Sequence, residues 1–230
     1  MLEIPLGLDL GRNRMKDSYA TLLEAPNYSV VEAAVYLHLK PEEIRRWIHE
    51  EVIRASRNGL SFQNILELHI LKGLRKQTRL PMQRIRRALQ VYSETEKTAH
   101  PLLDRRLETD GASLFLHDGE DYYNLNRSRQ MGFRQILATY LQRIHHLGDG
   151  QIVYFPFIAS EDPNEPKNIQ MTPAVAFGRP VLAKTGITAD VIVGRFRARD
   201  TITELAEEYG VSPAMIEDCV RLELPQKNAA

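Results

Sequence analysis

The amino-acid sequence predicts an α+β fold that is mostly α-helical, with helices toward both ends and β-hairpins between them. Two stretches 172 residues apart share one helix-capping pattern, which predicts a related pair of helices in each half. Short segments around Gly-containing turns in the centre predict hairpins. No uncharged stretch is longer than 11 residues, whereas a membrane-spanning helix needs roughly 18 or more, so a globular chain is expected.

Charge is distributed unevenly along the 230 residues, although the net charge is zero. Residues 1–106 hold 18 basic and 13 acidic side chains, and residues 107–230 hold 12 and 17. Halves of opposite charge predict two tasks, or two halves that dock on each other. Residues 72–93 carry seven basic side chains and no acidic one, which favours either a DNA or partner contact or a solvated face.

The N-terminal half is predicted to hold a series of helices after a polar arm. Ser29 and Glu32 form a capping box at the start of one helix. Pro41 suits the first turn of the next helix, which runs to about Glu50. After these come a strand at Val52–Ser56, a turn at Arg57-Asn58-Gly59, helices that begin at Ser61 and Pro81, and a polar linker at residues 93–111.

The centre is predicted to hold two hairpins with one helix between them. The first hairpin pairs Ser113–His117 with Glu120–Leu125, and the second pairs Arg143–Leu147 with Gln151–Phe157. Met131–Leu141 has the spacing of a helix. The remaining expected elements are a flexible linker at Ser160–Lys167, a short strand at Pro180–Ala183, and helices capped by Thr188, Thr201 and Ser212.

The repeated pattern is typical of a helix-turn-helix. The first copy contains Ser29, Glu32, Ala34, Pro41 and Ile44, and the second contains Thr201, Glu204, Ala206, Pro213 and Ile216. The second helix of the first copy carries Arg45, Arg46 and His49, whereas that of the second carries Glu217 and Asp218 on an expected solvated face. Because DNA phosphates dominate affinity and repel carboxylates, we assign nucleic-acid binding to the first copy and protein contact to the second.

Tyr28–Arg87 resembles the MerR-type winged helix-turn-helix. The likeness rests on Tyr28-Ser29-x-x-Glu32-Ala33-Ala34, Ile44-Arg45-Arg46-Trp47, the short Arg57-Asn58-Gly59 wing and Leu80-Pro81-Met82-x-x-Ile85. It implies that Arg45 or Arg46 contacts a DNA phosphate or base edge. It also implies that Arg57 and Asn58 lie along the DNA backbone. The dimerising helix and effector domain of MerR regulators do not follow. The expected DNA-binding residues are Lys40, Arg45, Arg46, His49, Arg57 and Asn58.

The C-terminal half resembles a small homeodomain-like antitoxin domain of bacterial toxin–antitoxin modules. The likeness rests on Pro173-x-x-Ala176-Phe177-Gly178-Arg179-Pro180-Val181-Leu182-Ala183-x-Thr185-Gly186-Ile187, and it continues to Val211. Together with a MerR-like domain, this looks like a VapB-type antitoxin, whose partner is a PIN-type ribonuclease toxin. The resemblance implies a chain that neutralises the toxin and represses its own operator. A homodimer is expected because dimers read palindromic half-sites.

Arg195, Arg197 and Arg199 alternate in sequence and are the expected toxin contacts. PIN nucleases hold Mg²⁺ or Mn²⁺ with carboxylates, and guanidinium groups match carboxylates in geometry. The same arginines could instead be surface charge or partners of the acidic helices in this chain.

No motif predicts catalysis, a metal site or a cofactor, so the chain is expected not to be an enzyme. GxSxG, P-loop, HExxH and GxGxxG patterns with suitable context are absent. The single cysteine, Cys219, excludes an intrachain disulfide and falls at the position equivalent to Trp47, so a buried place is expected. No signal peptide is expected, which favours a cytoplasmic location.

The expected organisation is an N-terminal arm at 1–26, a MerR-like winged helix-turn-helix at 27–100, a central hairpin and helix segment at 101–160, and a homeodomain-like antitoxin domain at 161–230. Two alternatives remain open. One is a stand-alone DNA-binding transcription regulator that senses a ligand through residues 112–157. The other is a protein-interaction module whose two helix-turn-helix copies form an internal dimer interface.

Overall fold

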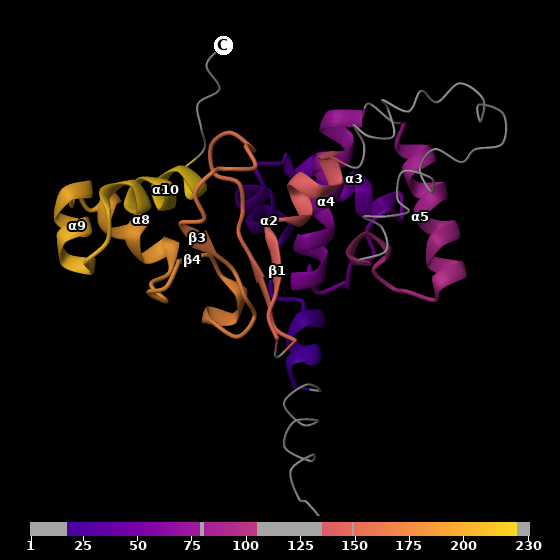
Figure 1. Ribbon diagram of the computed structural model, residues 1–230, viewed down its shortest axis with the longest axis horizontal. Coiled ribbons are helices and arrows are strands. Elements are labelled where there is room, and N and C mark those ends of the chain that lie inside the picture. The colour runs from indigo at the N-terminus through magenta and orange to yellow at the C-terminus, as the bar shows by residue number, and fades with distance from the viewer. Residues whose placement is uncertain (1–17, 79–80, 105–134, 149, 225–230) are drawn as a thin grey trace, which may run out of the picture.

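The computed structural model describes residues 18–78, 81–104, 135–148 and 150–224. These residues are mostly helical, with two small antiparallel sheets, so the predicted α+β class is confirmed. Figure 1 shows α8, α9 and α10 at one end, α5 at the other, and α2, α4 and β1 between them. The helices are α2 (Val30–Leu37), α3 (Pro41–His49), α4 (Phe62–Thr78), α5 (Met82–Glu96), α8 (Ala189–Arg197), α9 (Ile202–Tyr209) and α10 (Pro213–Glu223), with 3-10 turns η1 (Pro101–Leu103) and η2 (Ala176–Gly178). The strands are β1 (Ile144–His146), β2 (Ile152–Tyr154), β3 (Ile169–Gln170) and β4 (Val181–Leu182).

Helices α2 and α9 begin with the two predicted capping boxes. The Glu32 amide donates to the Ser29 hydroxyl at 3.1 Å, and the Ser29 amide donates to the Glu32 carboxylate at 2.8 Å. Thr201 and Glu204 make the same pair of bonds at 3.2 and 2.8 Å. Both boxes satisfy amides that a helix start leaves without partners, so the local sequence fixes where each helix begins.

The turns after α2 and α9 also match. His38 and Gly210 both lie in the left-handed region, with φ of 51° and 65°. The next amide then bonds back to a small residue of the helix, Leu39 to the Ala34 carbonyl at 2.9 Å and Val211 to the Ala206 carbonyl at 3.0 Å. The two helical pairs α2–α3 and α9–α10 therefore share one backbone plan.

Apolar residues at equivalent places hold each pair together. Ile44 and Trp47 of α3 are fully buried, and so are Ile216 and Cys219 of α10. Burial raises the pKa of the Cys219 thiol to about 12, so it is an uncharged core group. The expected core places of Trp47 and Cys219 are confirmed.

The expected strand at Val52–Ser56 is wrong. The amides of Val52 and Ile53 both donate to the Trp47 carbonyl, at 2.9 and 3.3 Å, and the chain there turns around the end of α3. Only isolated bridges, Ser56 with Gly59 and Tyr28 with Leu60, form at the expected hairpin. Here the helix end, rather than a neighbouring strand, satisfies the backbone.

The second central hairpin is confirmed, because β1 pairs antiparallel with β2 in a register that places Ile144 opposite Tyr154. The short strand expected at Pro180–Ala183 is β4, which pairs with β3. Residues 135–141 are helical as expected. The first expected hairpin and residues 131–134 lie outside the described residues.

Ser160–Lys167, the expected flexible linker, is held firmly at both ends. The Glu165 carboxylate accepts from the backbone amides of Ile158, Ala159 and Ser160. The carbonyls of Glu165 and Pro166 accept from the Arg143 guanidinium at 2.7 and 3.3 Å. The polar composition that resembles a linker therefore serves internal hydrogen bonds.

The two halves pack on each other through α10. This helix contacts α8 and α9 of its own end and also α2 and β3. The Tyr28 hydroxyl, ahead of α2, donates to the Gly178 carbonyl of η2 at 2.8 Å. The docking of two halves, which the charge asymmetry left open, is thus a feature of the fold.

Candidate functional site

The exposed face of α3 presents the cations that the sequence singled out. Lys40, Arg45, Arg46 and His49 are all exposed, while Ile44 and Trp47 on the opposite face are buried. Pro41 is the first residue of α3, and the helical repeat of about 3.6 residues places the exposed and the buried side chains on opposite faces. Arg45, Arg46 and His49 therefore lie on the face of α3 opposite Ile44 and Trp47, and Lys40 is exposed directly before the helix.

The expected wing, which follows α3 in the chain, is a tight turn. Arg57 and Asn58 are exposed, and Gly59 has φ of 144°. A Cβ at Gly59 would lie 2.8 Å from the Tyr28 carbonyl oxygen, so only glycine allows this close approach. The turn projects two polar side chains away from the core.

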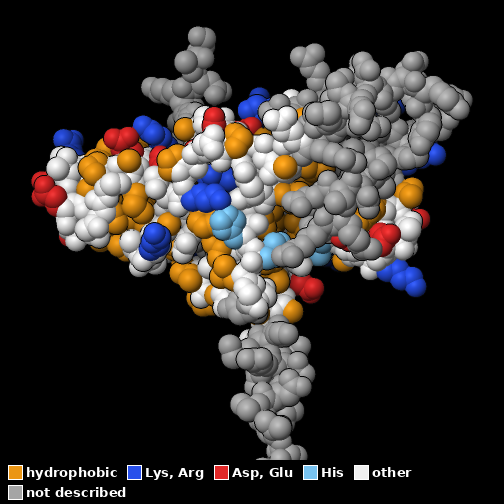
Figure 2. Space-filling view, viewed as in Figure 1, with side chains coloured by type: hydrophobic (Ala, Val, Ile, Leu, Met, Phe, Trp, Pro, Cys, Tyr) orange, Lys and Arg blue, Asp and Glu red, His pale blue; other side chains and the backbone are white. Residues whose placement is uncertain are grey.

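Acidic side chains moderate the basic character of this region. Glu42 lies 3.5 Å from Arg45, although both are exposed, and such pairs contribute little. The basic run at 72–93 is partly used inside the molecule, because Lys72 and Lys76 pair with Glu161 at 2.7 and 3.0 Å. The described surface in Figure 2 accordingly mixes both signs of charge with apolar areas.

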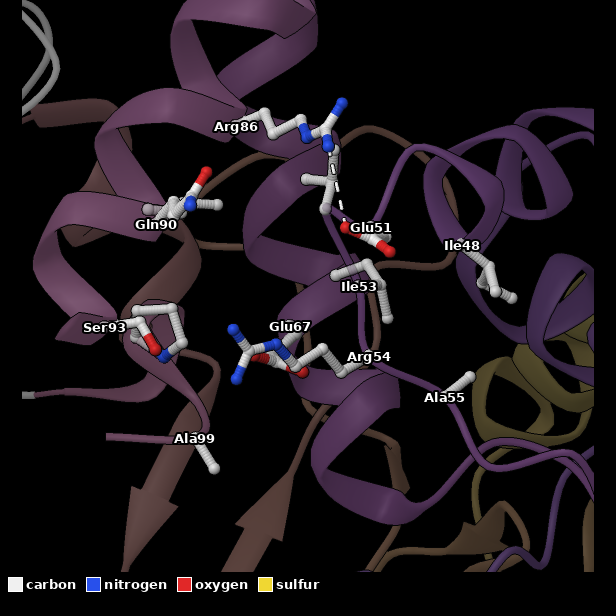
Figure 3. Close-up of a pocket in the computed structure, with 13 residues that line it drawn as sticks. Ile48, Glu51, Ile53, Arg54, Ala55, Glu67, Arg86, Gln90, Ser93 and Ala99 are labelled. Carbon is white, nitrogen blue, oxygen red and sulfur yellow. Dashed lines mark ion pairs between the residues drawn. The ribbon is translucent and has the colours of Figure 1, made fainter. Parts of the chain in front are cut away.

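A cavity of about 530 Å³ lies between the end of α3 and α5. Figure 3 shows Arg86 and Gln90 of α5 on one side and Glu51 and Ile53 on the other, with Arg86 paired to Glu51 at 3.6 Å. Glu67 is buried at its base, where it accepts from Asn64 at 3.2 Å. The cavity combines charged and apolar walls and is large enough for a small molecule.

The equivalent face of α10 is not available in the same way. Asp218, which aligns with Arg46, is 9% exposed and accepts from the Asn168 side-chain amide at 2.8 Å. Glu217 pairs with Arg221 at 2.9 Å. The expectation that Asp218 lies on a solvated face is therefore wrong, because the chain before β3 covers it.

The three expected toxin-contacting arginines differ in their surroundings. Arg195 binds the carboxylates of Glu208 and Asp200 and the Tyr209 hydroxyl. These bonds raise the pKa of Arg195 above its ordinary value, and the bond with Glu208 has the largest effect. Arg197 and Arg199 are exposed. The structure therefore gives Arg195 the intramolecular role that the sequence left open.

A buried polar network joins α4 to the central segment. The His69 ring contacts the Tyr140 carbonyl at 3.0 Å and the Tyr154 hydroxyl at 2.9 Å. Burial lowers the pKa of His69 to about 3, so the ring is neutral. The Tyr140 hydroxyl donates to Glu161 at 2.6 Å. These buried hydrogen bonds therefore hold α4 against the central segment.

Sequence reasoning missed Arg143 and Phe177. Arg143 is fully buried, and its guanidinium donates to four backbone carbonyls, including that of Phe155 at 2.8 Å. Phe177 is 74% exposed with φ of 54°. The local sequence does not predict that Arg143 is buried or that Phe177 is exposed, because burial depends on segments far apart in the chain.

Within the described residues, no group of three or more His, Cys, Asp or Glu side chains is placed to hold a metal ion. No helix in the same part of the chain is long and apolar enough to cross a bilayer.

Known proteins are similar to this chain over most of its length. Residues 169–221 match a family described as "Protein of unknown function (DUF433)". A Mycobacterium tuberculosis protein named "Putative antitoxin VapB45" is 26% identical over 231 residues, covering 86% of this chain and 93% of that protein. The X-ray crystal structure of Rv2018 from Mycobacterium tuberculosis is 24% identical, with a TM-score of 0.68 over 86% of this chain and 99% of that one. This chain is thus similar in sequence to a protein named as an antitoxin, and its fold is similar to that of Rv2018.

Proposed function

We propose that this chain is a non-enzymatic, cytoplasmic antitoxin that neutralises a PIN-type ribonuclease toxin and represses its own operator as a homodimer. The observation that carries the proposal is the similarity to a protein named as an antitoxin, which extends over 86% of this chain. The match spans 86% of this chain and 93% of that protein, so the proposal concerns most of the chain rather than one segment. Under it, residues 27–100 bind DNA as a winged helix-turn-helix and residues 161–230 bind the toxin.

The exposed cations of α3 support the DNA-binding part. Arg45, Arg46 and His49 are exposed on α3, Lys40 is exposed directly before it, and Arg57 and Asn58 are exposed on the turn that follows. Side chains of this kind contact phosphates and base edges in the major groove. The carboxylates at the equivalent places of α10, Glu217 and the covered Asp218, support giving DNA binding to the first helical pair alone.

Co-purification tests the antitoxin part. The tagged chain is expressed together with the two reading frames that flank its gene, and any bound partner is tested for Mg²⁺-dependent RNA cleavage with and without the chain. A nuclease silenced by the chain is the expected result. A chain that purifies alone, or a partner without nuclease activity, would contradict the proposal.

A charge-removal pair tests the DNA part. The double substitution Arg45→Ala and Arg46→Ala is expected to weaken binding to the upstream DNA of the gene and to leave toxin inhibition intact. The matched control, Arg197→Ala with Arg199→Ala, removes two exposed cations elsewhere and should retain DNA binding. Equal losses in both variants would show only nonspecific attraction.

A transcription regulator that senses a small molecule is the second candidate, favoured by the cavity of about 530 Å³, which is lined by residues between Ile48 and Pro101 and so lies outside residues 112–157, where the sequence placed the sensor. A ligand that changes operator affinity without any protein partner would favour this candidate. The end of α3 and α5 form walls of this cavity, so a bound ligand would contact the helix that carries the proposed DNA-binding residues.

A further inference from the structure

The turn before β4 holds three consecutive residues in the left-handed region. Ala176, Phe177 and Gly178 have φ of 47°, 54° and 84°. Glycine adopts this conformation freely, whereas a bulky side chain there is a rare exception. Phe177 is also the most exposed of the large apolar side chains in the described residues, at 74%. The described residues thus cover only a small part of the ring, and this packing does little to offset its unfavourable backbone.

The base of this turn is rigid. Gly178 accepts a hydrogen bond from the buried Tyr28 hydroxyl at 2.8 Å. Its amide donates to the Val175 carbonyl at 3.0 Å, and the Arg179 amide donates to the Ala176 carbonyl at 3.1 Å. Rigid presentation of an aromatic ring lowers the entropy lost on binding. Backbone strain of this kind concentrates at functional positions.

A hollow of about 280 Å³ lies next to the turn, between α2, the start of α8 and the end of α10. Val31, 55% exposed, stands at its rim on α2, and Val191, 47% exposed, follows Asp190 of the α8 wall. Three exposed apolar side chains, Val31, Phe177 and Val191, therefore belong to the segments that frame one hollow.

Carboxylates outnumber cations in the hollow. Glu32, Asp190 and Glu223 line it together with Arg179, which lies 3.6 Å from Asp190, and Arg197 is near enough to act on Glu223 as well. Burial and the nearby Asp190 raise the pKa of Glu223. A cationic side chain placed here would relieve the crowding of carboxylates.

We propose that Phe177 and this hollow form the toxin-binding surface: the ring enters an apolar socket of the toxin, and a toxin Lys or Arg enters the hollow. The proposal rests on the antitoxin function. Charge favours the toxin over a second copy of this chain, because a two-fold interface centred on this hollow would place its carboxylates against themselves. Aromatic anchors beside complementary charge are typical of the residues that dominate binding energy.

The test uses the full-length chain and the toxin identified by co-purification. Phe177→Ala and Val31→Lys are each expected to raise the Kd by at least about tenfold. The matched controls, Leu147→Ala and Val91→Lys, change side chains that are 45% and 51% exposed on other surfaces and should leave the Kd unchanged. Phe177→Gly is expected to weaken binding equally while its Tm equals or exceeds that of the wild type, since glycine accepts the positive φ.

The outcomes separate this proposal from the antitoxin function. A wild-type chain that binds no toxin would contradict both. If Phe177→Ala and Val31→Lys bind the toxin with the same Kd as the wild type, the proposed toxin-binding surface is wrong and the antitoxin function still stands. If these variants no longer form a homodimer in sedimentation but still bind the toxin, the surface contacts a second copy of this chain, and the proposal is wrong.

Discussion

The Tyr28 hydroxyl and the Gly178 carbonyl, 150 residues apart in the chain, are joined by a buried hydrogen bond of 2.8 Å. Tyr28 precedes α2 and Gly178 closes η2, so one bond couples the proposed DNA-binding half to the proposed toxin-binding turn. The approach is close enough that a Cβ on Gly178 would lie 2.0 Å from the Tyr28 oxygen. The close approach therefore requires glycine at position 178, and the hydrogen bond requires the hydroxyl of Tyr28.

We expect Gly178→Ala to lower the free energy of unfolding more than Gly210→Ala. Both glycines have positive φ, so both variants incur about 1–2 kcal/mol of backbone strain. A Cβ at Gly210 meets open space, whereas one at Gly178 meets Tyr28. Urea unfolding of the two variants separates strain from collision. Equal losses would show that the contact with Tyr28 relaxes without cost.

We expect Tyr28→Phe to lower the free energy of unfolding by about 1–2 kcal/mol, because it leaves a buried carbonyl without its donor. The same change should partly rescue Gly178→Ala, since the hydroxyl oxygen is the nearest atom to the new Cβ. A double-mutant cycle measures this coupling. Additive effects in the cycle would contradict a direct contact.

The buried His69 predicts a pH dependence of stability. Burial lowers its pKa from 6.5 to about 3, so below pH 6.5 the unfolded chain binds a proton that the folded chain excludes. The free energy of unfolding should therefore fall as pH drops from 6.5 toward 3, by up to about 1.4 kcal/mol per pH unit. His69→Gln removes this contribution, and urea unfolding at several pH values should show a shallower slope. Parallel slopes for the two proteins would refute the assignment to His69.

Glu161 is the shared partner of Lys72, Lys76 and the Tyr140 hydroxyl. Although burial opposes its charge, these partners lower the pKa of Glu161 to about 2. Its stabilisation is therefore present above about pH 4.5 and is lost as the pH falls toward 2. We expect Glu161→Gln to cost about 2 kcal/mol at neutral pH. The control Glu42→Gln removes an exposed carboxylate and should change little.

Arg195 and Arg197 should separate structure from binding. Arg195 connects α8 to Asp200 and to Glu208 of α9, whereas Arg197 is exposed. We expect Arg195→Ala to lower the Tm and Arg197→Ala to leave it unchanged. If Arg195→Ala abolishes toxin binding with the Tm unchanged, its contacts within the chain are dispensable and a direct toxin contact is favoured.

Local patterns in the sequence predicted the elements whose signals lie within a few residues. The Ser29 and Thr201 capping boxes, the prolines that open α3 and α10, and the β1–β2 hairpin all follow from hydrogen bonds between near neighbours. The expected strand at Val52–Ser56 failed because its amides bond to the Trp47 carbonyl at the end of α3. A strand needs a partner, and no local pattern says whether one is present.

Local patterns alone predict two helical pairs with one backbone plan, one bearing cations and the other carboxylates at equivalent positions. Packing between distant segments leaves Arg46 exposed, whereas it covers Asp218 and bonds it to Asn168. It also places Phe177 on the surface and Arg143 among four carbonyls. The difference arises from distance along the chain. Capping and helical periodicity involve residues within about one helical turn, whereas burial and ion pairing depend on which distant segments pack together.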